Sequence, residues 1–232
     1  MVIIFQDRRQ AGLALARVVR DELDEEPRAD NALVLGLPRG GVPVAFEVAC
    51  GLCLPLDVFV VRKLGVPGQE ELAMGAVASG GLVVIQSDVV SAYAISQETI
   101  DGIAARERVE IERREEAYRG GRPPASVAGR TAILVDDGLA TGATMKAAAR
   151  ALRPLARRIV VAVPVAARST CDELRREVDQ VVCLETPEPF HAVGEFYRNF
   201  DQTTDAEVRA LLARAAVRPG DWAGAHGEHS PR

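Results

Sequence analysis

The sequence predicts an α/β fold with a doubly wound, mainly parallel sheet, helices on both faces of that sheet and a small C-terminal hood. Short apolar runs rich in β-branched residues alternate with segments of helical spacing along the chain. Several of these runs are apolar at nearly every position, as expected for strands that are covered on both faces. Three of the expected strands end in distinctive Gly-containing or charged segments, and ligands bind at the carboxyl ends of strands in such sheets.

Each expected strand is a short apolar run bounded by turn residues. In chain order, strands are expected at residues 32–37, 56–62, 82–85, 131–135, 159–165 and 180–184. Residues 64–81 are rich in Gly and acidic residues and show little periodicity, so a loop is expected there.

Helices are predicted where apolar residues recur at helical spacing behind a capping residue. They are expected at residues 8–23, 42–51, 97–119 and 143–153, from about residue 170, and from residue 204 to about residue 217. Capping-box spacing occurs at Asp7 and Gln10, at Thr170 and Glu173, and at Thr204 and Glu207.

The chain is expected to form one core with a C-terminal addition, because no long linker divides it. Residues 1–185 should form the core, including the N-terminal helix. Residues 186–218 should form the hood and the last helix, and residues 219–232 should form a disordered tail.

The composition is that of an ordinary globular protein, with 48% hydrophobic and 26% charged residues among 232. The formal net charge of −5 argues against a general binder of nucleic acids or membrane surfaces. No apolar run approaches the roughly 20 residues of a membrane span, and the opening MVIIFQDRRQ lacks the order of a secretory signal. We therefore expect a cytoplasmic protein without nucleic-acid or membrane partners.

Four cysteines occur in the chain, and Cys50 and Cys53 form a CxxC pair. A zinc site would need a second such pair, or a His pair at ligand spacing, and the sequence contains neither. The CxxC also falls where the expected helix at residues 42–51 gives way to the turn before a strand, which favours a structural role over a redox site. We expect buried free thiols at these positions.

Residues 133–144 (ILVDDGLATGAT) combine an apolar strand with a small-residue loop that opens a helix. Gly138 and Gly142 allow the backbone to turn tightly and to bring several N–H groups toward one point. Thr141 and Thr144 add hydroxyl donors, and the positive end of the following helix points to the same place. This combination predicts a binding site for a monophosphate.

Two adjacent carboxylates, Asp136 and Asp137, stand between this strand and the loop. They would repel a bound phosphate unless they bind something else. The vicinal hydroxyls of a ribose donate hydrogen bonds and meet that need, and a bridging Mg²⁺ would reduce the remaining repulsion. The segment therefore predicts a site for a 5-phosphorylated ribose.

The same segment resembles the signature of the type I phosphoribosyltransferases, which consists of an apolar strand, an acidic pair, a short loop and Thr-Gly-x-Thr. Ala143 stands where the family pattern often has a second Gly. The resemblance implies that Asp136 and Asp137 hold the 2- and 3-hydroxyls of the ribose and contact Mg²⁺ indirectly, through those hydroxyls or through water. The residues that would wrap the 5-phosphate are Gly138, Leu139, Ala140, Thr141, Gly142, Ala143 and Thr144.

A second match is LPRGGV, residues 37–42, which resembles the diphosphate loop of this family. In that loop of the family, backbone N–H groups and a cationic side chain contact the diphosphate. Arg39, Gly40 and Gly41 would do so here, with a strained or cis peptide near Arg39.

A third match is VRKLGVPG, residues 61–68, which resembles the family's Arg-Lys-x-Gly stretch. Arg62 or Lys63 would neutralise the departing diphosphate there, and residues 64–81 would correspond to the mobile catalytic loop. Together with the late PEPFHAVGEFYRNF, this spacing resembles a bacterial group of phosphoribosyltransferases of uncertain substrate.

The resemblance implies an enzyme that binds phosphoribosyl diphosphate with Mg²⁺ as its cofactor, transfers phosphoribose to a nitrogen base and releases diphosphate. Its catalytic residues would be Asp136, Asp137, Arg39 and Lys63, and Arg62 would bind the substrate. Relatives of this fold are often dimers, so a homodimer is one option. The sequence leaves open the acceptor and the choice between transfer and hydrolysis.

For each of two groups of side chains, the sequence leaves two interpretations open. Glu70 and Glu71 are either a general base for the nucleophile or solvated loop acids. Residues 187–201 concentrate the aromatic side chains of the hood, which either stack on a planar base or pin the C-terminal segment to the core. His191, in the same segment, is either a ligand contact or a surface residue.

One rival function is a non-catalytic regulator that senses phosphoribosyl diphosphate or a nucleotide on the same fold. The net charge and the lack of a dedicated basic segment argue against a nucleic-acid-binding regulator. A P-loop NTPase and a dinucleotide-binding enzyme are disfavoured, because the sequence contains neither G-x-x-x-x-G-K-[ST] nor G-x-G-x-x-G.

Overall fold

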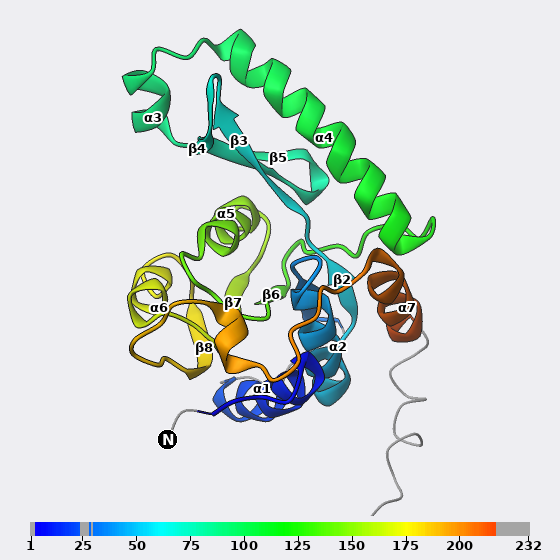
Figure 1. Cartoon of the computed structure of the whole chain (residues 1–232). Coiled ribbons are helices and arrows are strands. Elements are labelled where there is room, and N and C mark those ends of the chain that lie inside the picture. The colour runs from blue at the N-terminus through cyan, green and yellow to red at the C-terminus, as the bar shows by residue number, and fades with distance from the viewer. Residues whose placement is uncertain (1–2, 24–27, 29, 217–232) are drawn as a thin grey trace, which may run out of the picture.

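Five parallel strands form the core sheet of the computed structural model, which describes residues 3–23, 28 and 30–216 (Figure 1). Their order is β2-β1-β6-β7-β8. Their bounds are Ala32–Gly36 for β1, Leu56–Val58 for β2, Thr131–Val135 for β6, Arg158–Val165 for β7 and Gln180–Glu185 for β8. The strand order reverses between β1 and β6, so the predicted doubly wound, mainly parallel α/β fold is confirmed.

Helices cover both faces of the core sheet because its strands carry apolar side chains on both sides. In β1, Leu33 joins the buried cluster that includes α5 and α6, whereas Val34 joins the cluster that includes α1 and α2. The bounds of these helices are Arg8–Glu22 for α1, Gly41–Leu52 for α2, Ala143–Leu152 for α5 and Arg168–Leu174 for α6. A last helix, α7 (Asp205–Ala215), packs against α2.

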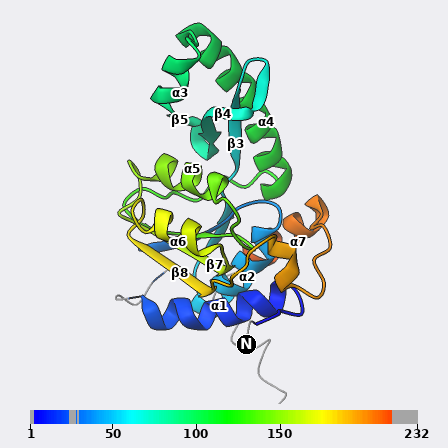
Figure 2. The ribbon, with the colours of Figure 1, turned by 60° about the vertical axis from the view of Figure 1, so that its left-hand side comes forward.

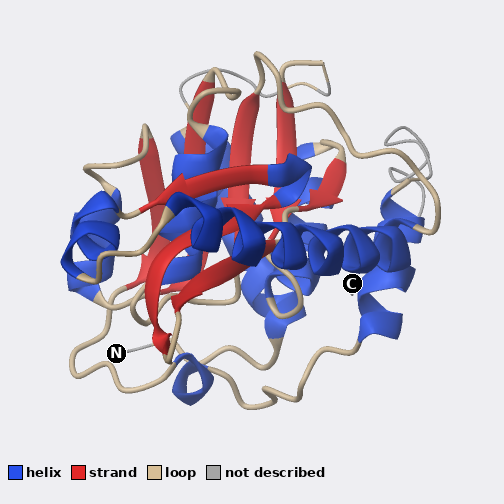
Figure 3. Ribbon diagram, turned by 90° about the horizontal axis from the view of Figure 1, so that it is seen from above, coloured by secondary structure: helices blue, strands red, loops and turns tan. Residues whose placement is uncertain are grey.

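A second, antiparallel sheet lies outside the core, with strand order β3-β4-β5. Figures 1 and 2 show this sheet and the long helix α4 at one end of the molecule, opposite α1, and the view from above shows them lying across the core (Figure 3). The bounds are Val61–Val66 for β3, Gln69–Ala78 for β4, Ser79–Gly81 for η1, Leu82–Ile85 for β5, Ser87–Ala92 for α3 and Gln97–Arg119 for α4.

The prediction of a loop over residues 64–81 is wrong, and so is that of a single strand over residues 56–62. Strands β3 and β4 pair instead as an antiparallel hairpin that includes most of these residues. Leu64 and Met74 are fully buried in a cluster with Ile100 and Ala104 of α4, and Val89 and Val90 of α3 pack against the same cluster, so later segments of the chain cover the apolar face of the hairpin. Gly65 sits at an irregularity in the pairing, where an added Cβ would lie 2.8 Å from the Glu70 carbonyl oxygen. Gly65 and Gly75 therefore allow close strand contact, whereas Gly68, Gly80 and Gly81 have positive φ.

Two of the three expected capping interactions form. The Asp7 side chain accepts a hydrogen bond from the Gln10 N–H, and Thr204 and Glu207 form a full capping box at α7. The capping box at Thr170 is wrong, because α6 begins earlier, at Arg168, with no side-chain cap. The Thr170 hydroxyl instead donates to the Ala140 carbonyl, which ties α6 to the loop after β6.

The four cysteines are free thiols, as expected. Cys171 is buried and Cys50 and Cys183 are partly buried, but Cys53 is exposed, so the prediction of burial is wrong for Cys53. Cys53 has φ 55°, which follows from its place at the left-handed end of α2. The tail expected at residues 219–232 lies outside the described residues.

A buried ion pair joins the end of α4 to the core. The Arg119 Nε lies 2.8 Å from the Asp57 Oδ1, and the two side chains are only 7% and 9% exposed. Asp57 also accepts hydrogen bonds from the Val58 and Ala125 N–H groups. This carboxylate therefore holds together β2, the last turn of α4 and the segment that returns to β6.

Replacing Arg119 with Met is expected to lower the free energy of unfolding by about 3 kcal/mol, because Asp57 would remain buried without its cation. Urea denaturation measures the change. The matched control is Arg175→Met, since the Arg175–Asp172 pair is about half exposed on each side. That control should cost no more than about 0.5 kcal/mol. Equal losses in the two variants would show that the buried pair has no special role.

Candidate functional site

The loop after β6 is fixed to the core by its backbone and leaves its polar side exposed. The Leu139 N–H donates to the Val165 carbonyl, and the Leu139 carbonyl accepts from the Ala167 N–H, both at 3.0 Å. The Leu139 side chain is buried in the core, so this residue anchors the loop through packing. Thr141 and Thr144, by contrast, are exposed.

Two glycines in this loop are required by close contacts. Gly142 precedes α5 with φ 67°, a conformation that favours glycine, and an added Cβ there would lie 2.6 Å from the Thr170 Cγ2. At Gly138 an added Cβ would lie 2.5 Å from the Val193 Cγ1, which belongs to the C-terminal segment. The loop therefore turns tightly into the N-terminus of α5, where the N–H groups of the first helical turn and the helix dipole favour an anion.

The acidic pair lies at the carboxyl end of β6, as the sequence predicts for a strand that ends at Val135. The Asp136 Oδ1 accepts a hydrogen bond from the Asp137 N–H at 2.9 Å. Burial and the neighbouring carboxylate raise the pKa of Asp136 well above its usual value. Burial also raises the pKa of Asp137, and this effect is opposed by the guanidinium of Arg8.

The turn before α2 packs directly on these two carboxylates. An added Cβ at Gly40 would lie 2.1 Å from the Asp137 Oδ2, and one at Gly41 would lie 2.9 Å from the Asp136 Oδ1. The Pro38–Arg39 peptide is cis, in agreement with the expectation for this turn. The structure thus brings together two of the three segments that the sequence singles out.

Arg39 itself does not contact the acidic pair. Its Nη1 lies 3.7 Å from the Asp205 Oδ1 at the start of α7, and its side chain is 38% exposed. Asp205 also accepts a hydrogen bond from the Tyr118 hydroxyl at 3.0 Å. Arg39 is therefore at the rim of the site, paired with an exposed carboxylate.

The third segment is split between the two faces of β3. Lys63 lines a cavity of about 390 Å³ between the second sheet and α5, together with Thr141 and Thr144 of the loop after β6. Arg62 points to α4, where its Nε lies 2.6 Å from the Glu107 Oε2. The structure therefore brings Lys63 to the loop and places Arg62 away from it.

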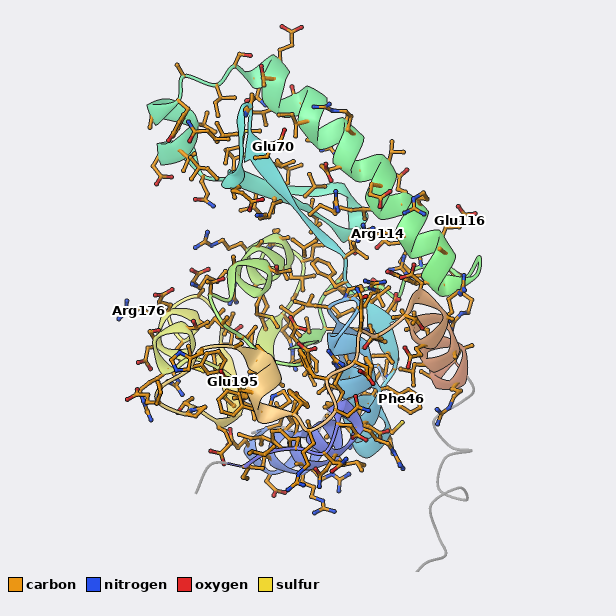
Figure 4. The ribbon with its side chains drawn as sticks, viewed as in Figure 1. Phe46, Glu70, Arg114, Glu116, Arg176 and Glu195 are labelled. Atoms are coloured by element: carbon orange, nitrogen blue, oxygen red, sulfur yellow. The ribbon has the colours of Figure 1, made fainter. Side chains whose placement is uncertain are left out.

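The two acids of the hairpin lie near its tip. Glu71 is fully exposed, with its Oε2 3.4 Å from the Lys63 Nζ, and Glu70 lines a larger cavity next to Arg62. Figure 4 shows Glu70 beside the hairpin, far from Glu195 in the C-terminal segment. The role of either acid as a general base stays a prediction.

The aromatic side chains of residues 187–201 pack mainly on one another and on the N-terminal segment. The Tyr197 and Phe200 ring centroids are 4.9 Å apart, and the Tyr197 and Phe5 centroids are 5.8 Å apart. Phe196 and Tyr197 are only 6% exposed, which favours the packing interpretation for these two residues. His191 is exposed. The short helix η2 (Val193–Phe196) places Val193 against the loop at Gly138.

Two contact residues of this site, Arg8 and Lys146, are not among the residues expected from the sequence, and Tyr197 is expected only as one of the aromatic side chains of residues 187–201. Arg8 and Tyr197 both bond to Asp137, and Lys146 donates to the Thr141 carbonyl at 3.2 Å. Lys146 could have been found from its place one turn into the helix after the loop. Arg8 gave no local signal, because it lies 129 positions from Asp137 in the sequence.

The described residues contain no group of three or more His, Cys, Asp or Glu side chains that could hold a metal ion. The acidic pair offers hard carboxylate oxygens, which is the donor type that Mg²⁺ prefers. Among the described residues, no helix has the length and apolar character that crossing a membrane requires.

The fold and this site define a protein of the phosphoribosyltransferase class. The family model "Phosphoribosyl transferase domain" matches residues 6–201, so the chain belongs to this family. Two relatives from Mycobacterium tuberculosis, "Putative phosphoribosyl transferase MT0597" (strain CDC 1551 / Oshkosh) and "Putative phosphoribosyl transferase Rv0571c" (strain ATCC 25618 / H37Rv), are each 47% identical over 91% of this chain. The match covers 47% of each relative, so the chain spans about half their length.

Among solved structures, TT1426 from Thermus thermophilus is similar to this chain along nearly its whole length. The two are 44% identical with a TM-score of 0.81, and the match covers 92% of this chain and 100% of TT1426. The arrangement of the two sheets is therefore shared with a structure of closely related sequence.

Proposed function

We propose that this protein is a phosphoribosyltransferase that binds phosphoribosyl diphosphate with Mg²⁺, transfers phosphoribose to a nitrogen base and releases diphosphate. One observation carries the proposal: the Gly40–Gly41 turn and the loop after β6 meet at the two carboxylates of Asp136 and Asp137. Donors for two phosphate groups and acceptors for sugar hydroxyls are thereby gathered at one end of the core sheet.

Each part of the site has a separate role in this proposal. The amides between Ala140 and Thr144 and the two Thr hydroxyls bind the 5-phosphate, and the acidic pair accepts hydrogen bonds from the ribose hydroxyls. The expectation that Leu139 wraps the phosphate does not hold, because its N–H donates to the Val165 carbonyl. The turn before α2 would bind the diphosphate through the Gly40 N–H, because the Gly41 N–H donates to the Leu37 carbonyl at 3.0 Å. Lys63 faces the same cavity as the loop, which supports a role in neutralising negative charge on the ligand.

Catalysis then consists of electrostatics and positioning. Positive charge builds on the sugar as its bond to the diphosphate breaks, and the nearby carboxylates stabilise that charge. Asp136 and Asp137 would hold Mg²⁺ indirectly, through the ribose hydroxyls or through water, and the ion would supply positive charge that stabilises the leaving diphosphate. The second sheet lies on the α5 side of the core and lines one cavity with Thr141 and Thr144, which would limit the access of water there.

A turnover assay tests the proposal. Phosphoribosyl diphosphate and Mg²⁺ are incubated with the protein and a panel of purines, pyrimidines and other amines, and diphosphate release is followed. Release that depends on one acceptor is the expected result. Release without any acceptor would show hydrolysis. Binding without turnover would favour the sensing regulator, and a failure to bind would contradict the proposal.

Replacing Arg39 with Ala is expected to lower kcat by about 30-fold while changing the affinity for ribose 5-phosphate by less than about twofold. Ribose 5-phosphate lacks the diphosphate that Arg39 would meet, so its binding reports only on the rest of the site. Calorimetry and the turnover assay together measure the split. The control is Arg168→Ala, whose side chain is 60% exposed beside Glu188. Equal losses of turnover and of ribose 5-phosphate affinity would mean that Arg39 supports the fold.

A further inference from the structure

Arg8, in the first turn of α1, reaches the acidic pair from the N-terminal end of the chain. Its Nε lies 2.8 Å from the Asp137 Oδ2, and the two side chains are 12% and 15% exposed. Its Nη1 donates to the Asp201 carbonyl at 2.7 Å. Its guanidinium lies 4.0 Å from the centre of the Phe200 ring. Three different contacts thus fix one side chain.

The backbone around Arg8 is also fixed. The Phe5 N–H donates to the Phe196 carbonyl at 2.8 Å, and the Arg198 N–H donates to the Phe5 carbonyl at the same distance. The Asn199 N–H donates to the Gln6 carbonyl at 3.0 Å. The N-terminal segment and the C-terminal segment are therefore joined, and Arg8 projects from their junction onto the site.

Asp137 is held on three sides. Arg8 bonds to the Asp137 carboxylate, and the Tyr197 hydroxyl donates to the Asp137 carbonyl at 2.5 Å. Gly40 has no Cβ, which leaves room for the Asp137 Oδ2 beside it. A carboxylate has about four acceptor positions, so the Arg8 bond leaves capacity for a sugar hydroxyl. A planar guanidinium that stacks on a ring and bonds through fixed N–H directions limits rotation of its partner.

We propose that Arg8 is a positioning residue, which orients the Asp137 carboxylate toward the ribose hydroxyls through a bond that forms at the junction of the two chain ends. The proposal rests on the function proposed above. The Arg8 guanidinium is directed at the Asp137 carboxylate and the Asp201 carbonyl, so it acts on the ligand through Asp137. Its effect should therefore appear in the binding of the sugar and leave the binding of a phosphate in the loop unchanged.

Calorimetric titrations of the full chain with ribose 5-phosphate and with inorganic phosphate test this inference. Arg8→Gln should weaken ribose 5-phosphate binding about tenfold, because the carboxylate loses its fixed orientation, and should change phosphate binding by less than about twofold. Arg8→Lys keeps the charge without the planar fork, so its affinity for ribose 5-phosphate should lie between those of the wild type and Arg8→Gln. The matched control is Arg9→Gln, because the Arg9 side chain is 66% exposed and its Nε lies 3.4 Å from the Glu47 Oε1.

Several outcomes would overturn the inference. Equal ribose 5-phosphate affinities in Arg8→Gln and Arg9→Gln would do so while the proposed function stands. A parallel loss of phosphate binding would show that Arg8 only supports the fold. If Arg8→Gln fails to fold, Phe200→Leu is measured instead, since it removes the stacking ring and leaves both charges. An unchanged affinity of this variant for ribose 5-phosphate rejects the inference. A loss of affinity for ribose 5-phosphate without a loss for inorganic phosphate supports it. A wild-type protein that binds no ribose 5-phosphate would overturn both the inference and the proposed function.

Discussion

The double replacement of Asp136 and Asp137 by Asn is expected to lower the affinity for phosphoribosyl diphosphate at least about 100-fold. A hydrogen bond to a charged group contributes about 1.5–3 kcal/mol, and two such bonds to ribose hydroxyls would be weakened together. The amides would also turn donors toward those hydroxyls. Calorimetry with the ligand and Mg²⁺ measures the loss.

The fold should survive this replacement. Burial raises the pKa of both Asp136 and Asp137, which means that the folded protein disfavours their charged forms. Asn has the same shape and removes that charge, although it weakens the bond to Arg8. The melting temperature of the variant checks the fold. Asp172→Asn, at an exposed acid of α6, is the matched control and should bind as the wild type does. Unchanged affinity for phosphoribosyl diphosphate in the double variant would show that the acidic pair is not part of the binding site.

Gly40→Ala is expected to lower kcat/KM about 100-fold, because a misplacement of about 1 Å in a positioned group has effects of that size. Gly40 has φ −60° and ψ −33°, a conformation that Ala adopts without strain. The obstacle is contact: the new Cβ would lie 2.1 Å from the Asp137 Oδ2. Asp137 cannot move away freely, since Arg8 and Tyr197 hold it. Steady-state kinetics measure the change.

The control for this variant is Gly102→Ala in α4, where an added Cβ would meet no heavy atom within 4 Å. Ala is favoured over Gly inside a helix by about 1 kcal/mol, so this control should retain its activity and melt at a higher temperature. If Gly40→Ala folds and its kcat/KM stays within about twofold of the wild type, the turn does not need to approach the acidic pair.

Local patterns were sufficient where neighbours in the sequence decide the structure. The strand at residues 131–135, the strand at residues 82–85 and the helix at residues 97–119 have the predicted bounds. Each of these is a continuous apolar or helix-forming run with its own start and stop signals. The hairpin of β3 and β4 has no such run, because its buried face is completed by α4 and two of its glycines, Gly65 and Gly75, serve strand contacts. Its pairing therefore could not be read locally.

The sequence by itself determined the parallel α/β core and the position of the acidic pair and its glycine-rich loop at the end of a strand. These features follow from hydrophobic periodicity and from short-range backbone preferences, which act between near neighbours along the chain. Only the tertiary structure decided that Lys63 faces the loop while Arg62 pairs with Glu107, and that Arg8 bonds to Asp137. Those contacts join residues 45 to 129 positions apart. The packing of whole elements brings them together, so no local pattern encodes them.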